Sequence, residues 1–125
     1  MFSKDTCEKR FEIAKGWCRD LGLISERAFS LMFDINVQNG TLYKKIPARG
    51  IDVQAAIEKR ITNAGAPGEE DKLVIIAEER SKASNPKWIQ VVLSRKLTIA
   101  RGQGKVYGAM VNLEDFGISI DTPFA

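Results

Sequence analysis

The chain has 125 residues, of which 44% are hydrophobic and 28% are charged, and its formal net charge is +3. This size and balance suit one ordinary domain, or a helical unit joined to a second small unit, and they exclude a disordered chain. No apolar run approaches the roughly 20 residues that a membrane-spanning helix needs, and no charged-then-apolar leader opens the sequence, so we expect a cytoplasmic protein that does not enter a membrane.

The chain contains no histidine and has two cysteines, Cys7 and Cys18. On one helix, two residues eleven apart lie about 16 Å apart along the axis, so these thiols cannot bridge each other there, and both are expected in the core. Without histidine, a metal site has few ligands and the commonest general base is missing. No phosphate-binding glycine loop is present either. We therefore expect no metal, no cofactor, no small-molecule substrate and no enzymatic activity.

Capping residues mark the first two predicted helices. One begins near Asp5 or Thr6, both competent N-caps, and runs to Asp20, with Gly22 as its stop. Its apolar positions are spaced four and three apart, as a single helical stripe requires. The stripe comprises Cys7, Phe11, Ala14, Cys18 and Leu21. The next helix is expected to begin after Ser25.

The segment from Ala28 to Ile46 can be laid out as a helix, a sharp turn and a second helix. The first helix buries Leu31, Met32 and Ile35 on one face. Asn36 is predicted to form the turn, because Asn tolerates a left-handed backbone better than any residue except Gly. The second helix then exposes amide, hydroxyl and ammonium groups, which suit major-groove and phosphate contacts. The exposed residues are Gln38, Asn39, Thr41, Tyr43, Lys44 and Lys45.

The next predicted elements lead to a boundary in the middle of the chain. Pro47 is expected to end the preceding helix, and a fourth helix begins at Asp52, another competent N-cap. Residues 63–68 are rich in Gly and Pro and form the strongest linker signal. We therefore expect two units, residues 1–65 as a helical unit and residues 66–125 as a small α/β unit, either separate or packed as one domain.

The second half has a different texture. Residues 69–83 place acids in the first turn and bases in the last, as a helix dipole prefers, although the apolar run at 73–76 also fits a buried strand. Residues 88–93 and 97–100 are rich in β-branched and aromatic side chains and predict strands. A helix starting at Pro86 is the alternative.

A glycine pair predicts a hairpin further along the chain. Residues 102–104 are predicted to form the tip between strands over 97–101 and 105–112. A turn predicted at Phe116 and Gly117 precedes a further strand. Trp88 is expected in the core, with a base-stacking platform as the alternative. The predicted fold class is α+β, with a four-helix unit containing a helix-turn-helix, then a helix and a small antiparallel sheet. An all-α fold is the alternative.

Two stretches of the chain are basic and contain no acidic residue, residues 35–51 and residues 80–113. Summed charge on one face attracts phosphate backbones, so these stretches indicate a side that faces a polyanion. The alternative is that basic and acidic segments pair across the fold. The candidate phosphate contacts in the second stretch are Arg95, Lys96, Arg101 and Lys105.

The spacing of Leu31, Met32, Asn36, Val37 and Leu42 resembles the lambda-repressor-like helix-turn-helix family, which includes phage-type repressors. The resemblance covers about half of the chain, and Asn36 stands at the family's glycine position. It implies a DNA-reading helix. The DNA-facing positions that it implies are Gln38, Asn39, Thr41, Tyr43, Lys44 and Lys45, and the adjoining basic loop adds Arg49.

These observations lead to the expectation of a repressor-type regulator that binds double-stranded DNA. A single reader helix reaches a few base pairs, so a homodimer on two half-sites is expected, with the second half of the chain mediating dimerisation or extending the phosphate contact. Two alternatives stay open. One is an accessory protein that binds RNA or single strands through the basic region from Arg80 to Lys105. The other is a non-catalytic subunit of a larger assembly, whose apolar hairpins pair with another chain.

Overall fold

The computed structural model describes residues 4–106 and 109–112, with side chains described over residues 8–102. Five α-helices lie in the described residues: α1 Lys4–Leu21, α2 Glu26–Asn39, α3 Val53–Asn63, α4 Glu69–Lys82 and α5 Ile89–Arg101. Two antiparallel hairpins flank them: β1 Lys45–Ile46 with β2 Ile51–Asp52, and β3 Gln103–Val106 with β4 Ala109–Asn112. The fold is mainly α-helical with small antiparallel sheets. This agrees in outline both with the predicted α+β class and with its all-α alternative.

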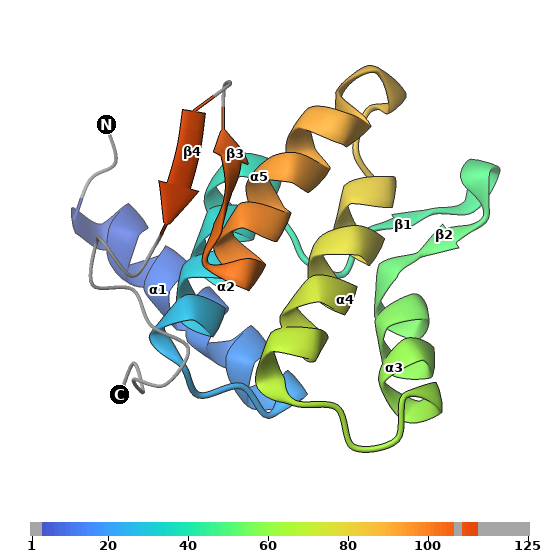
Figure 1. Ribbon diagram of the computed structural model, residues 1–125, viewed down its shortest axis with the longest axis horizontal. Helices are drawn as coiled ribbons and strands as arrows, with labels where there is room; N and C mark the ends of the chain where they lie inside the picture. Colours follow the sequence, from blue (N-terminus) through green and yellow to red (C-terminus); the bar gives the residue numbers. More distant parts are fainter. Residues whose placement is uncertain (1–3, 107–108, 113–125) are drawn as a thin grey trace.

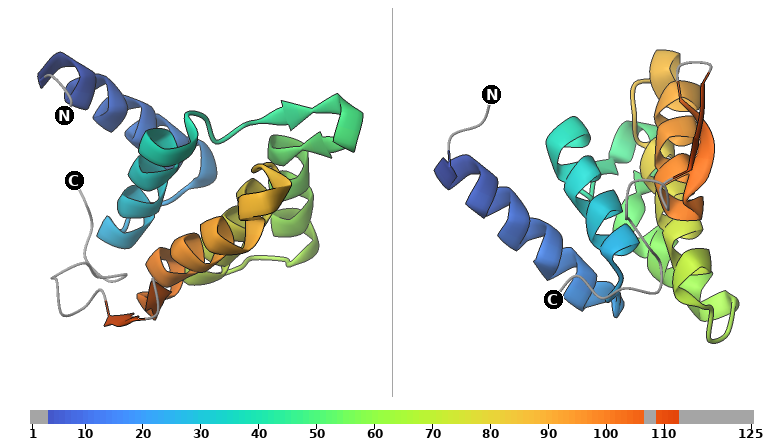
Figure 2. Two further views of the ribbon diagram at one scale, coloured as in Figure 1. Left: turned by 90° about the horizontal axis from the view of Figure 1, so that it is seen from above. Right: turned by 60° about the vertical axis from the view of Figure 1, so that its left-hand side comes forward.

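The central element of the fold is α2. It contacts α1 on one side and the pair formed by α4 and α5 on the other, while α3 packs along α4 (Figure 1). The two views in Figure 2 show α2 between α1 and α5. Leu31, Met32 and Ile35 of α2 are fully buried in the shared core, as their spacing predicted. Within the described residues, no helix combines the length and apolar character needed to cross a bilayer.

The predicted helix starts at Ser25 and Asp52 are confirmed. The Ser25 hydroxyl accepts a hydrogen bond from the backbone N–H of Ala28 at 3.0 Å, and the Asp52 carboxylate accepts one from Ala55 at 3.2 Å. Each side chain satisfies a backbone donor that the first helical turn leaves without a partner. The break over residues 63–68 separates α3 from α4, and the helix favoured for residues 69–83 is present as α4.

The turn predicted at Asn36 is wrong, because α2 continues through this residue and ends at Gly40. Gly40 has a φ of +87°, a conformation that favours glycine, and its N–H donates to the Asn36 carbonyl. The Asn36 amide nitrogen donates to the Gly40 carbonyl at 2.9 Å, and Arg10 of α1 donates to both oxygens of Asn36. Asn36 therefore stabilises the end of the helix and does not interrupt it.

The reader helix predicted over residues 37–46 does not form. Residues 37–39 complete α2, residues 41–44 form a connecting segment, and Lys45 begins strand β1. Residues 47–49 are a 3-10 turn at the tip of the β1–β2 hairpin. Between α1 and α3 the chain therefore contains one helix and a hairpin, where two helices were expected.

The strands predicted over residues 88–93 and 97–100 are also wrong, since residue 88 ends the 3-10 turn before α5 and the other residues lie in α5. The alternative is confirmed, because Pro86–Trp88 is a 3-10 turn that leads directly into α5. Packing of α5 against α4 and α2 outweighs the strand preference of β-branched residues. Gly102, with a φ of +81°, ends α5, and residues 103–106 pair with 109–112. The hairpin tip predicted over residues 102–104 is therefore wrong, because Gln103 and Gly104 belong to strand β3. The strand predicted after Gly117 lies outside the described residues.

Cys18 lies in the hydrophobic core, as expected, with no exposed surface. The side chain of Cys7 lies outside the described residues. Burial raises the pKa of the Cys18 thiol to about 12, and the charge of Glu69 adds to the effect. The thiol is therefore neutral in the folded protein over the ordinary pH range, and neutral buried thiols are unreactive.

We expect the stability of the protein to fall as the pH rises above 9. The unfolded thiol ionises from about pH 9, while the folded thiol keeps its proton until about pH 12, so the unfolded state binds fewer protons in this window. Between pH 8 and pH 10 the wild type should lose about 1 kcal/mol more unfolding free energy than Cys18→Ala, which has no thiol there. Urea unfolding at both pH values measures the difference. Identical pH dependence in the two proteins would contradict the assignment.

Candidate nucleic-acid interface

The residues predicted to face DNA belong to three successive parts of the chain: the end of α2, the connection after it and the start of β1. Gln38 lines a groove between helices, while the backbone carbonyls of Asn39 and Thr41 accept hydrogen bonds from the guanidinium of Arg80 at 3.2 and 2.7 Å. Arg80 is almost completely buried, and its burial lowers the pKa of its guanidinium. It fastens the segment after α2 to α4, which directs the next residues towards the hairpin.

Tyr43 serves as a packing residue in this segment. Its ring packs against the core, and its hydroxyl donates to Asp20 of α1 at 3.5 Å. Burial and the negative charge of Asp20 raise the pKa of the Tyr43 hydroxyl to about 12. Lys44 and Lys45, which follow Tyr43, are both exposed. Of the six predicted reader positions, these two lysines keep accessible charged side chains.

The candidate phosphate contacts of α5 differ in exposure. Lys96 is fully buried, and its ammonium lies 2.9 Å from one oxygen of Asp34, while Arg95 lies 2.7 Å from the other. Burial lowers the pKa of Lys96, and the charge of Asp34 opposes this shift. Arg101 is exposed at the C-terminal end of α5, and the side chain of Lys105 lies outside the described residues. Lys96 therefore stabilises the interior instead of presenting its charge to a partner.

The fold brings the two acid-free stretches together at one edge of the molecule. Arg49, at the tip of the β1–β2 hairpin, donates to the carbonyl of Lys82 at 2.7 Å and to the carbonyl of Ser84 at 3.0 Å. These carbonyls belong to the end of α4 and the turn after it, where a helix dipole favours a cation. Figure 1 shows this hairpin on the side of the molecule opposite to α1.

This region, which we call the basic edge, carries five exposed cationic residues. Among the described side chains, carboxylates approach two of them: Asp52 lies 3.9 Å from Lys45, and Glu79 lies 2.9 Å from Lys82. In the described part of the chain, the other three cations have no carboxylate within ion-pair distance. Sequence reasoning found both stretches but had no signal for their contact, because Arg49 and Ser84 are 35 residues apart. The basic edge comprises Lys44, Lys45, Arg49, Lys82 and Lys87.

Trp88 stands next to the basic edge and is 51% exposed, so its predicted place in the core is wrong. Its backbone N–H donates to the Asn85 carbonyl at 2.8 Å, and the Asn85 side chain accepts from the N–H of Lys87 at 3.0 Å. The Lys87 ammonium lies 5.1 Å from the centroid of the indole ring. Trp88 precedes the first residue of α5, and its exposed face continues along that helix to Val91.

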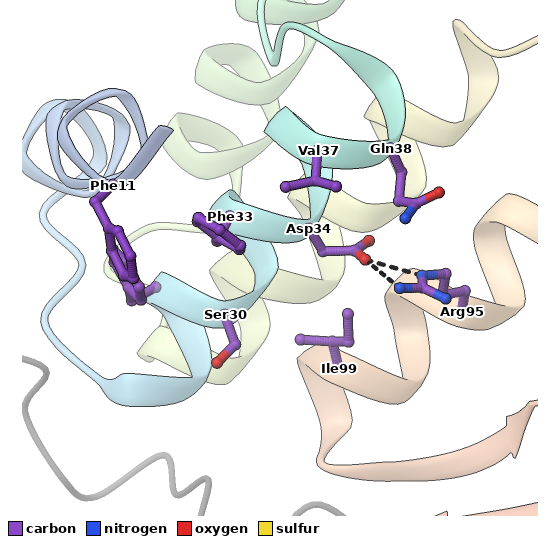
Figure 3. Close-up of a pocket in the computed structure, with 9 residues that line it drawn as sticks. Phe11, Ser30, Phe33, Asp34, Val37, Gln38, Arg95 and Ile99 are labelled. Carbon is purple, nitrogen blue, oxygen red and sulfur yellow. Dashed lines mark hydrogen bonds and ion pairs between the residues drawn. The ribbon is translucent and has the colours of Figure 1, made fainter. Parts of the chain in front are cut away.

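A second surface feature is a groove of about 440 Å³ between α1, α2 and α5 (Figure 3). Phe11, Phe29 and Phe33 gather on one side, with ring centroids 5.0 to 6.1 Å apart. The ion pair between Asp34 and Arg95 lies at the other side. The groove is apolar over most of its wall. Its remaining lining residues are Ser30, Val37, Gln38 and Ile99.

Neither surface has the ligand set of a metal centre. Within the part of the chain that the structure describes, no three carboxylate or thiol side chains gather as a cation site. The chain matches no protein-family model, no curated protein and no solved structure. The fold and its surfaces define a mainly α-helical protein with a basic edge beside an exposed tryptophan.

Proposed function

We propose that the protein binds nucleic acid through the basic edge, with phosphate groups as the main contacts. One observation carries the proposal: Arg49 joins the hairpin to the end of α4, so that two stretches without acids share a surface. Clustered Lys and Arg side chains attract phosphate backbones and release their counterions on binding. Within the described residues, both hydrogen bonds of Arg49 end on carbonyl oxygens, so they leave its positive charge without neutralisation by a carboxylate.

A repressor-type role on double-stranded DNA stays a prediction, and so does a homodimeric state. The described geometry changes the way in which such a role would work. Lys44 precedes strand β1 and Lys45 begins it, so neither lysine lies in a reader helix. The contact to the duplex would therefore come from the hairpin. A two-stranded ribbon fits the major groove as a helix does.

The steepness of the salt dependence tests the proposal. For each phosphate group that a variant no longer neutralises, the magnitude of the slope of log K against log salt should decrease by about 0.7 on single strands and by about 0.9 on duplex DNA. We therefore expect Lys44→Gln/Lys45→Gln to reduce the slope by up to about 1.4 on single strands and about 1.8 on duplex. Fluorescence anisotropy of labelled 20-nucleotide single strands and 20-base-pair duplexes, titrated at several KCl concentrations, measures the slope.

A matched control separates a local contact from a general effect of net charge. Lys9→Gln/Arg19→Gln removes the same charge from exposed positions of α1, which lies far from the hairpin in Figure 1. This control should leave the slope unchanged. If both double variants reduce the slope equally, the basic edge is not the contact surface. If the wild type binds neither form of nucleic acid at 50 mM KCl, the proposed function is wrong.

A further inference from the structure

The exposed tryptophan beside the basic edge has a specific use in nucleic-acid binding. We infer that an unpaired base stacks on Trp88, which makes single-stranded nucleic acid the preferred ligand of the edge. This inference rests on the proposed function, because phosphate contacts by the neighbouring cations would deliver the strand to the ring.

The first argument is the exposure and surroundings of the ring. Burying a tryptophan is strongly favourable, yet Trp88 keeps 51% of its surface in solvent, and Val91, one turn further along α5, is 52% exposed. These residues form an apolar strip in a stretch of the chain that contains no acid. Aromatic rings in cationic surroundings are the usual stacking platforms for single strands, since every base offers a π-face.

The second argument is the rigidity of the turn that carries Trp88. Pro86 has a restricted φ, and the Asn85 side chain accepts from the backbone of Lys87. The Asn85 carbonyl accepts from the N–H of Trp88. The backbone of the tryptophan is therefore fixed before a ligand arrives, which reduces the entropy lost on binding.

The third argument is the position of the charges around the ring. The Lys87 ammonium lies 5.1 Å from the indole centroid. Arg49 is held next to the segment that leads to Trp88, because it donates to the carbonyls of Lys82 and Ser84. A base on the open part of the indole would place its phosphates next to these cations. Arg101, by contrast, stands at the far end of α5, about 20 Å from Trp88 along the helix axis, so it contributes no charge to this site.

A duplex cannot use this platform without disruption. Its bases are stacked on one another, and extracting one costs a few kcal/mol of stacking and pairing. Phosphate contacts by the lysines, in contrast, are open to both forms of nucleic acid. The indole therefore discriminates between single and double strands, while the lysines supply affinity for both.

The test measures binding of labelled dT20 and of a random 20-base-pair duplex by wild type and Trp88→Ala. We expect Trp88→Ala to weaken dT20 binding roughly tenfold, with less than a twofold change for the duplex. Trp88→Phe retains a smaller stacking face, so its affinity for dT20 should lie between those of wild type and Trp88→Ala. Ile24→Ala is the matched control, because Ile24 is 64% exposed in the connection between α1 and α2 and should change neither affinity.

A spectroscopic signal gives a second readout. Trp17→Phe leaves Trp88 as the single tryptophan of the chain, and saturation with dT20 should then quench its emission, whereas the duplex should quench it little. Equal losses of dT20 and duplex affinity in Trp88→Ala, or unchanged emission on saturation with dT20, would overturn the stacking site and leave the phosphate contacts standing. A change of oligomeric state in Trp88→Ala, with unchanged dT20 affinity, would assign the ring to a protein contact and also overturn the inference.

Discussion

Asp34→Ala is expected to lower the free energy of unfolding by about 3–5 kcal/mol at neutral pH. Asp34 accepts from the ammonium of Lys96 at 2.9 Å and from the guanidinium of Arg95 at 2.8 Å. Lys96 has no exposed side-chain surface, so loss of Asp34 leaves its charge in the interior without this counterion. Chemical denaturation followed by circular dichroism gives the measurement.

Two further variants isolate the cause of this loss. Lys96→Met introduces an apolar side chain of similar length and leaves Asp34 paired with Arg95. It should therefore change the free energy of unfolding by less than about 1.5 kcal/mol. In the double variant Asp34→Ala/Lys96→Met no buried ammonium remains at this position, and much of the loss should be recovered. A cost below about 1 kcal/mol for Asp34→Ala alone would show that the pair does not hold a charged lysine in the core.

The loss in Asp34→Ala should also shrink at alkaline pH. Burial lowers the pKa of Lys96, and removal of Asp34 takes away the main charge that opposes this shift. Between the pKa of Lys96 in the folded variant and its ordinary value of 10.5, the unfolded variant binds more protons than the folded one. The stability of Asp34→Ala therefore rises with pH in this window. At pH 9.5 the difference from wild type should therefore be smaller than at pH 7.

Leu42→Ala is expected to cost about 2–5 kcal/mol. Leu42 is fully buried in the core although it lies in the connection between α2 and β1 and not in a helix. Its side chain and the hydrogen bonds from Arg80 to Thr41 and Asn39 are what fix this connection. Thr41→Ala, at the exposed neighbouring position, should change stability by no more than about 0.5 kcal/mol. Equal effects of the two substitutions in urea unfolding would contradict the packing role of Leu42.

Local signals explain the parts of the fold that sequence reasoning predicted. Ser25 and Asp52 act within three residues of their own position, so the helix starts are encoded locally. The Gly- and Pro-rich break over residues 63–68 is local for the same reason. Segments with competing local signals were predicted wrongly. Asn36 can form a turn, but Arg10, 26 residues away in the sequence, binds both of its oxygens and holds it in the helix.

The candidate site was predicted less well, because its key contacts join distant parts of the chain. The environment of Lys96 depends on Asp34, which is 62 residues away, and a lysine that follows Arg95 in the sequence gives no sign that it will be buried. Trp88 has apolar neighbours, yet its place before the first turn of α5 leaves its ring outside the packed face. Both stretches without acids contribute residues to the basic edge, while Arg95 and Lys96 of the second stretch pair with Asp34, as the alternative interpretation of the charge pattern expected.

The two hydrogen bonds of Arg49 also couple local unfolding at two places in the molecule. The β1–β2 hairpin is short, and a two-stranded hairpin alone has marginal stability in water. Its tip is held by carbonyls of Lys82 and Ser84, so fraying at the end of α4 would free the tip, and displacement of the tip would uncover those carbonyls. We therefore expect the hairpin and the end of α4 to open together. A ligand that orders either part would then restrain the other through the hydrogen bonds of Arg49.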